Sequence, residues 1–359
     1  MTTQQTAPAA GGGESTLTVL VALGANAAIA VAKAVAAVIT GSAAMAAEAA
    51  HSVADTVNEV FLLVALRRST RAADPDHPFG YGQVRYFWSL IASVSIFVTG
   101  ALYSAYEGLE ALLGESHELT SPLVSYVVLG VSFVLEGVSW LRGLKQVRGE
   151  AREQQLSLRR FLRANDDPTA TTVVYEDSAA LVGLVLAAVG ITLHELTGSG
   201  VWDGVASLLI AALLALVALR LGRSNMRLLT GAGADRRMVR SIAAWLAQRR
   251  EVDAVVDLLT LQLGTDQVLV CARLDFDDDL VVADVERAAV RIGEDLKRAF
   301  PDVAEVFLEP VPGDDPEVRQ RVRDRYGDVI ADRLAGTSTG ASPRLDPSAQ
   351  PSAAEVPHR

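Results

Sequence analysis

One stretch of the chain carries residues that could bind a metal ion, although it lies inside an alanine- and leucine-rich run. It is AEAAHSVADTVNEV, residues 47–60, with His51 and Asp55 four positions apart. Side chains at this spacing lie one turn apart on the same face of a helix. A neutral imidazole nitrogen and a carboxylate so placed can both bind one divalent cation. Glu48 and Asn58 fall on the same stripe, so one face of this helix is expected to be polar.

A second apolar stretch, VVYEDSAALVG, carries Glu176 and Asp177. If the two helices pack side by side, His51, Asp55 and Asp177 could converge, and water, Glu176 or Asn58 could complete a shell of four ligands. A single polar residue in such a helix is often only hydrogen-bonded to a neighbour. The three together favour a shared metal site, because burying them without compensation would cost several kcal/mol.

The helices that must position these residues are membrane spans. Half of the 359 residues are hydrophobic, too many and too unevenly distributed for one soluble core. Crossing a bilayer takes about 20 apolar residues. Six such spans are predicted, at residues 17–39, 43–66, 84–112, 122–142, 170–195 and 201–222.

The basic residues predict the orientation of these spans. Lys and Arg gather after the second, fourth and sixth spans, and the other three connections contain neither. The positive-inside rule therefore places both termini in the cytoplasm. We expect a multi-pass protein of the inner (plasma) membrane, in contact with the lipid bilayer.

The sequence divides the chain into four segments, one of which contains the six spans. Residues 1–16 are expected to be a disordered leader, and residues 17–229 the transport domain. Residues 230–311 show the periodicity of a helix, two strands, a helix and a strand, an α-β-β-α-β domain. Residues 312–359 are compatible with one short helix but are expected to be mostly disordered, because their Pro, Ser and Gly content cannot bury a core.

Composition excludes several classes of protein. A net charge of −11 argues against nucleic acid as a partner and leaves cations as acceptable ligands. A single cysteine, Cys271, excludes an internal disulfide framework and a cysteine-cluster metal site. No resident cofactor is predicted beyond a transported ion.

The connection after the second span, AADPDHPFGYGQVRYFWSL, is the other concentrated signal. Asp74, Asp76 and His77 lie close together there, and Pro78, Gly80 and Gly82 favour a tight turn. The three residues could cap that turn or form a weak second cation site.

The stretches GSAAMAAEAAHSVADTVNEVFLL and HPFGYGQVRYFWSLI resemble the cation diffusion facilitator family of divalent-metal/proton antiporters. The resemblance covers roughly residues 15–311. It implies six transmembrane helices and a metallochaperone-like cytoplasmic domain that dimerises. It also implies that the second helix supplies two metal ligands, matched here by His51 and Asp55, and that the fifth helix supplies two more.

The sequence departs from this family at three places. Asp177 matches one ligand of the fifth helix, but Val173 stands one turn earlier, where the family has His or Asp. The adjacent Glu176–Asp177 pair resembles a subgroup of zinc transporters, which makes Glu176 the candidate replacement. Tyr81 stands where many relatives have a second loop histidine. The domain at 230–311 contains no histidine, so a dimerisation domain without a tight zinc cluster is expected.

The resemblance implies efflux of a divalent transition metal, most simply Zn²⁺, in exchange for protons by alternating access. One histidine among carboxylates is also compatible with Mn²⁺, Fe²⁺ or Co²⁺. Two other classes stay open: an intramembrane enzyme using the HxxxD pair as a base, for which neither a nucleophile nor a catalytic elaboration is visible, and a metal sensor that binds without transporting. We expect a transporter and not an enzyme.

Overall fold

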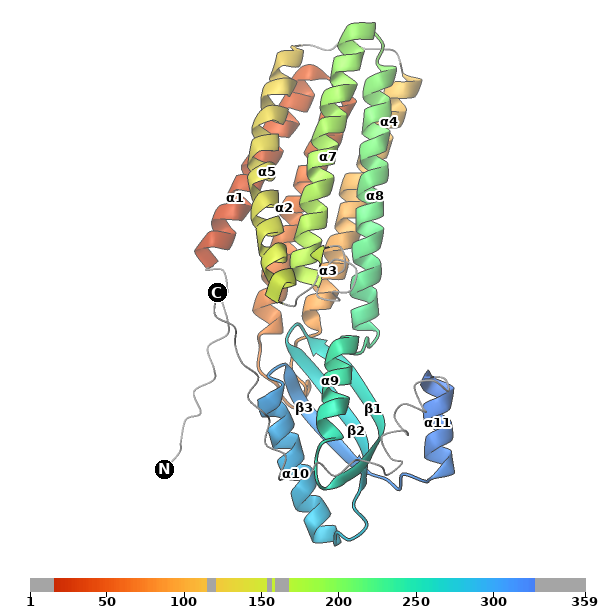
Figure 1. The fold of residues 1–359 in the computed structure, drawn as a ribbon. Coiled ribbons are helices and arrows are strands. Elements are labelled where there is room, and N and C mark those ends of the chain that lie inside the picture. Colours follow the sequence, from red (N-terminus) through yellow and green to blue (C-terminus); the bar gives the residue numbers. More distant parts are fainter. Residues whose placement is uncertain (1–15, 115–120, 154–156, 159–167, 327–359) are drawn as a thin grey trace, which may run out of the picture. The chain divides into compact units, whose positions relative to one another are not determined.

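The computed structural model describes residues 16–114, 121–153, 157–158 and 168–326. The chain divides into two compact units: one reaches Ala232 and includes Gln262–Gln267, and the other comprises Gly233–Leu261 and the chain from Val268. The first unit is built of long helices and the second contains the sheet (Figure 1). The predicted leader, except for Thr16, and the tail beyond residue 326 lie outside the described residues.

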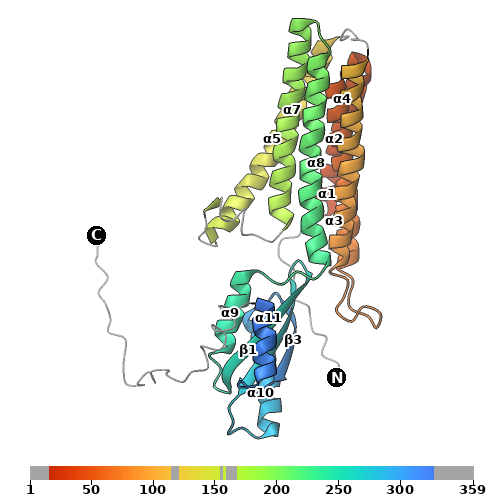
Figure 2. The same cartoon turned by 90° about the vertical axis from the view of Figure 1, so that its right-hand side faces the viewer.

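Among the described residues, six helical spans are long and apolar enough to cross a membrane, which confirms the predicted number. They lie side by side as a bundle (Figures 1 and 2). Two of them, α5 and α8, run past the predicted ends at residues 142 and 222, because turns bearing Lys and Arg continue the helix beyond the apolar stretch. The spans are α1 (Thr16–Thr40), α2 (Ala43–Ser69), α3 (Val84–Ser95) continued by η1 (Ile96–Leu102) and α4 (Tyr103–Leu113), α5 (Pro122–Glu153), α7 (Pro168–Thr197) and α8 (Val201–Leu229).

A tight turn joins α1 to α2 and sets where α2 begins. Gly41 has a φ of +69°, a conformation that glycine adopts without the strain of a Cβ. Ser42 caps α2 by accepting a hydrogen bond from the Met45 backbone N–H. Asp203, in the first turn of α8, accepts hydrogen bonds from the Ser42 hydroxyl at 2.8 Å and from the Ala43 backbone N–H at 2.5 Å. The buried Asp203 carboxylate therefore ties α8 to the start of α2.

Small residues allow the third span to approach α8 closely. A Cβ on Gly204 of α8 would lie 3.0 Å from the backbone oxygen of Gly108 in α4. A Cβ on Gly100, in the π-helical turn η1, would lie 3.1 Å from Leu214 Cδ1. Without a hydrophobic force between helices in lipid, such close packing is what stabilises a bundle.

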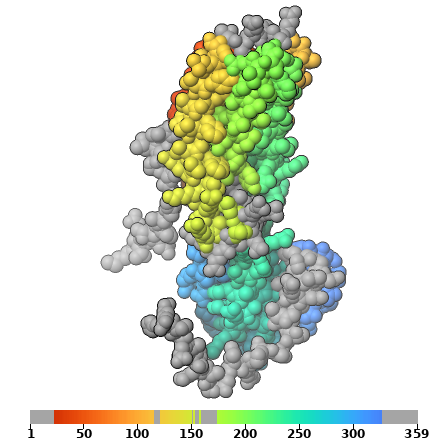
Figure 3. All heavy atoms as spheres, turned by 45° about the horizontal axis from the view of Figure 1, so that its top comes forward, coloured from red at the N-terminus to blue at the C-terminus, as the bar shows by residue number. Residues whose placement is uncertain are grey.

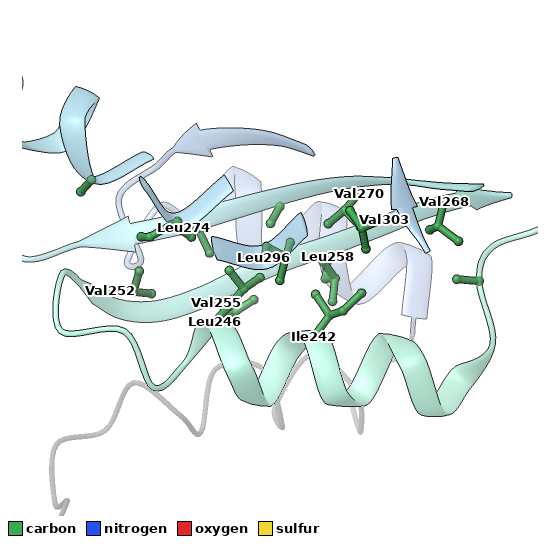
Figure 4. Packing of buried hydrophobic residues seen from close by; sticks show 14 of the residues in the cluster. Ile242, Leu246, Val252, Val255, Leu258, Val268, Val270, Leu274, Leu296 and Val303 are labelled. Carbon is green, nitrogen blue, oxygen red and sulfur yellow. The ribbon is translucent and has the colours of Figure 1, made fainter. Parts of the chain in front are cut away.

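The second unit contains the elements that the sequence predicts, in the predicted order. They are α9 (Arg236–Leu246), β1 (Val252–Gly264), β2 (Gln267–Phe276), α10 (Val282–Ala299) and β3 (Val303–Pro310). The sheet order is β1-β2-β3, and β2 runs parallel to β3 with Val270 opposite Val306. Helices α9 and α10 share one hydrophobic core with the sheet. Figure 4 shows Ile242 and Leu246 of α9 directed toward β1.

A further helix, α11 (Pro316–Tyr326), lies in the region expected to be mostly disordered. Arg325 of α11 donates a hydrogen bond to Asp257 of β1 at 2.8 Å, and Arg273 of β2 donates to the same oxygen at 3.2 Å. Asp257 is only 1% exposed. The two arginines therefore compensate a buried carboxylate, and one of them holds α11 against the sheet.

Candidate metal site in the helical bundle

His51 and Asp55 lie together on α2. His51 Nε2 is 3.6 Å from Asp55 Oδ2, as expected for side chains one turn apart. His51 is 4% exposed, and neither ring nitrogen has a hydrogen-bond partner among the described residues. A buried imidazole without a partner is costly, and binding a cation would satisfy it.

Glu176 and Asp177, adjacent on α7, face different neighbours. Glu176 accepts hydrogen bonds from the side-chain amide of Asn58 on α2, at 3.2 and 3.4 Å. Asp177 accepts one from the Ser139 hydroxyl of α5, at 3.1 Å. Consecutive residues point about 100° apart around a helix, so this division is expected. The α5 and α7 segments lie side by side on one face of the bundle (Figure 3).

The predicted ligands are therefore only partly brought together. Among the residues that the structure describes, no three His, Cys, Asp or Glu side chains are grouped closely enough to hold a metal ion. Asp55 still interacts electrostatically with Glu176 and Asp177, so the acidic groups of α2 and α7 act on one another across the helix contact.

A further acidic residue of this region, Glu59, is absent from the sequence-based ligand set. It interacts electrostatically with Asp55 and Asp177, and it accepts a hydrogen bond from Asn26 of α1. Its other carboxylate oxygen is buried without a partner among the described residues. The spacing in the sequence could have identified Glu59 as a member of this cluster, because Glu59 follows Asp55 by four positions, as Asp55 follows His51.

The loop after α2 is a capped turn in this structure. Asp74 accepts hydrogen bonds from the His77 backbone N–H at 2.8 Å and from the Tyr81 hydroxyl at 2.7 Å. The Tyr81 hydrogen bond, together with that of His77, holds the pKa of the Asp74 carboxyl below its usual value. Asp76 is exposed. Both oxygens of Asp74 are thus occupied by the turn itself.

A six-helix bundle with ionisable side chains facing one another inside apolar helices is the construction of a membrane ion transporter. The comparison with protein families agrees with this class. The model of the cation efflux transmembrane domain matches residues 19–230, and the chain belongs to this family of cation diffusion facilitators.

Individual relatives are named for transport of two different metals. The chain is 36% identical over 244 residues to the mitochondrial proton-coupled zinc antiporter SLC30A9 of Xenopus laevis, covering 68% of this chain and 44% of the relative. The human protein of that name is 34% identical over 68% of this chain and 43% of its own length. The manganese efflux system protein MneP of Bacillus subtilis is 24% identical over 80% of this chain and 93% of its own. The chain thus spans under half the length of the zinc antiporters that it matches.

Proposed function

We propose that this protein moves a divalent transition metal, Zn²⁺ in the first place, out of the cytoplasm in exchange for protons. The observation that carries the proposal is the buried imidazole of His51, which lies beside Asp55, has no hydrogen-bond partner among the described residues, and is carried by a helix that contacts the acidic helix α7. The ligands are His51, Asp55 and Asp177, and Glu176 or water completes the shell. Asn58 supports Glu176 from outside the shell.

Electrostatics supports a cation between α2 and α7. The carboxyl group of Asp55 interacts electrostatically with those of Glu176 and Asp177 within the bundle, and Glu176 interacts with Asp177. A divalent ion bound by all three ligands would offset their repulsion, and binding would require Asp177 to turn from Ser139 toward Asp55. Proton uptake by the same groups would release the ion, which links the two fluxes. Alternating access then requires α2 and α7 to shift relative to their neighbours.

Transport by reconstituted protein tests the proposal. Liposomes containing the full chain, an entrapped zinc indicator and a pH indicator should show Zn²⁺ uptake accompanied by proton movement in the opposite direction. His51→Ala, Asp55→Ala and Asp177→Ala should each abolish both signals, and Glu110→Ala, an exposed change on α4, should not. Normal transport by any two of the three site variants would contradict a shared site. Metal binding without flux would instead identify a sensor.

Metal selectivity is proposed from the ligand types. A single imidazole among carboxylates is less selective for Zn²⁺ than a two-histidine site, and the relatives are named for both zinc and manganese. Val173 lies one turn before Asp177 on α7, so Val173→His should add a nitrogen ligand and raise the preference for Zn²⁺ over Mn²⁺. An unchanged ratio in competition titrations would remove Val173 from the site. Glu176→Gln should weaken binding if Glu176 is the fourth ligand, and should have little effect if water is.

Location and assembly are also proposals. The basic connections support a plasma-membrane protein with both termini in the cytoplasm, whereas the relatives named above as zinc antiporters are mitochondrial by name. The second unit has its own hydrophobic core, in keeping with a cytoplasmic domain that dimerises. Cysteine labelling from either side of the liposomes and light scattering of purified protein would test orientation and dimerisation.

A further inference from the structure

Three charged side chains form a network inside the bundle that the metal site does not include. Lys33 of α1 lies with its Nζ 3.0 Å from Glu48 Oε2 of α2 and 3.0 Å from Glu136 Oε1 of α5. The side chains of Lys33 and Glu48 are fully buried, and that of Glu136 is 16% exposed. The network therefore joins three helices at a place that water hardly reaches.

The charges in this network do not balance. One ammonium faces two carboxylates, so the three ionised groups carry a net charge of −1. Their remaining oxygens, Oε1 of Glu48 and Oε2 of Glu136, are buried and have no hydrogen-bond partner among the described residues. A second carboxylate beside a single buried ammonium is costly unless it takes up a cation or a proton. Adding one proton makes the network neutral.

The network lies next to the helices that carry the proposed metal ligands. Glu48 precedes His51 by one turn on α2, and a Cβ on Gly183 of α7 would collide with its Oε1. Glu136 interacts electrostatically with Asp55 and Asp177. The charge of Glu136 therefore acts on metal ligands of both helices, and Glu48 lies against Gly183 at the contact between α2 and α7. The charged and titratable groups that act on Glu136 include Lys33 of α1, His51 and Asp55 of α2, and Asp177 of α7, and those that act on Glu48 include Lys33 and His51.

We propose that Glu48 and Glu136, bridged by Lys33, form a proton-binding site of the exchanger that is separate from the metal ligands. The network binds one proton, on one of its two carboxylates, when the metal site is empty. Metal arriving beside His51 and Asp55 adds positive charge nearby, breaks the carboxyl O–H bond and sends the proton to water. Because it assigns part of the counter-flux, this inference rests on the proposed function.

Proton counting during metal binding tests the proposal on the full chain in detergent. Zn²⁺ is added to weakly buffered protein with a pH indicator, and the protons released per bound ion are measured between about pH 6 and 8. Glu48→Gln and Glu136→Gln each leave one carboxylate on Lys33, which needs no proton. Each should therefore release about one proton fewer per metal than the unmodified protein while binding Zn²⁺ with an affinity within a few fold. The control variant Glu110→Gln, at an exposed position of α4, should release as many protons per bound metal ion as the unmodified protein.

The outcomes separate this inference from the proposed function. If both variants release as many protons as the unmodified protein, the proton-site inference is overturned and the transport proposal stands. If Glu48→Gln folds but no longer binds metal, the inference is also overturned, because Glu48 is then one of the metal ligands. Absence of metal binding in the unmodified protein would sink the proposed function and the inference with it. If Glu48→Gln does not fold, Glu136→Gln decides, because it retains the fully buried Lys33–Glu48 pair.

Discussion

At the residue scale, several polar groups of this bundle hydrogen-bond to a side chain on another helix, whereas His51 lies 3.6 Å from Asp55 on its own helix. Lys33, Asn26 and Asp203 each reach an acidic or hydroxyl partner on another helix. Both nitrogens of His51 are without one among the described residues. In an apolar bundle this difference separates side chains that hold helices together from a side chain available to an ion.

Tyr81 allows a test of the turn that the loop residues form. Because its hydroxyl is the largest cause of the lowered pKa of Asp74, Tyr81→Phe should move that pKa up toward the ordinary value of about 3.9. A lowered pKa stabilises the loop above the unfolded value, and that stabilisation is lost as pH falls through the folded value. The carboxyl ¹³C shift of Asp74, identified with Asp74→Asn, gives the titration curve.

Two results would bear on this assignment. The hydroxyl of Tyr126 on α5 donates a hydrogen bond to Glu195 and not to Asp74, so Tyr126→Phe should leave the titration curve of Asp74 unaltered. An unmoved pKa in Tyr81→Phe would mean that the backbone N–H of His77 and the charge of Arg71 suffice to hold it.

At the element scale, the contact between α2 and its neighbours decides the geometry of the site. The start of α2 is held by α8 through Asp203, and its middle faces α7 through Asn58 and Glu176. An element held at one end and polar along one face can tilt about that end. We therefore expect the Asp203 contact to stabilise the folded bundle. The face of α2 near Glu176 is expected to take part in metal transport.

Asp203→Ala tests the fixed end. It removes a buried acceptor of two hydrogen bonds at a helix N-terminus, so the protein in detergent should lose roughly 1–3 kcal/mol of stability. Thermal unfolding followed by circular dichroism measures the loss, with Glu110→Ala as the exposed control. Metal binding below the lowered midpoint should persist. Loss of binding at full stability would instead make Asp203 part of the transport pathway.

Helix α11 offers a second test at this scale. Asp257→Asn removes the negative charge that binds Arg273 and Arg325. Because both arginine side chains reach solvent, neither is left as a buried unpaired charge, and the free energy of unfolding should fall by roughly 1–3 kcal/mol. Urea unfolding of residues 233–326 gives this value. Arg325→Ala should cost less and should speed amide exchange in α11 alone. Equal protection of α11 in both proteins would show that other contacts hold the helix.

At the scale of the whole molecule, the two units carry different chemistry. Residues 233–326 contain no histidine, and the lone thiol, Cys271, has its pKa raised by burial, which disfavours the thiolate that binds metal. The acidic run Asp275–Leu280 begins at the end of β2 and continues into a turn, in which the Asp279 backbone N–H donates to Asp277. We therefore predict that this unit contributes protein contact and not metal sensing.

Titration of the separate unit checks this division. Residues 233–326 have their own core, so they should fold alone and show no Zn²⁺ binding tighter than micromolar in calorimetry. The full chain in detergent, which includes the bundle, serves as the comparison. A stoichiometric nanomolar site in the separate unit would contradict the assignment.

The sequence by itself determined the spans, the order α-β-β-α-β and the family, because each depends on local properties: the length of apolar stretches, the period of side chains and a contiguous motif. It also placed His51 and Asp55 on one helical face, since their spacing lies within a single element. The tertiary structure alone decided that Glu176 faces Asn58, that Asp177 faces Ser139 and that Lys33 bridges two glutamates. These pairings depend on how each helix is rotated against its neighbours, and that rotation follows from close packing of small residues such as Gly183 across helices, which no periodicity within one helix records.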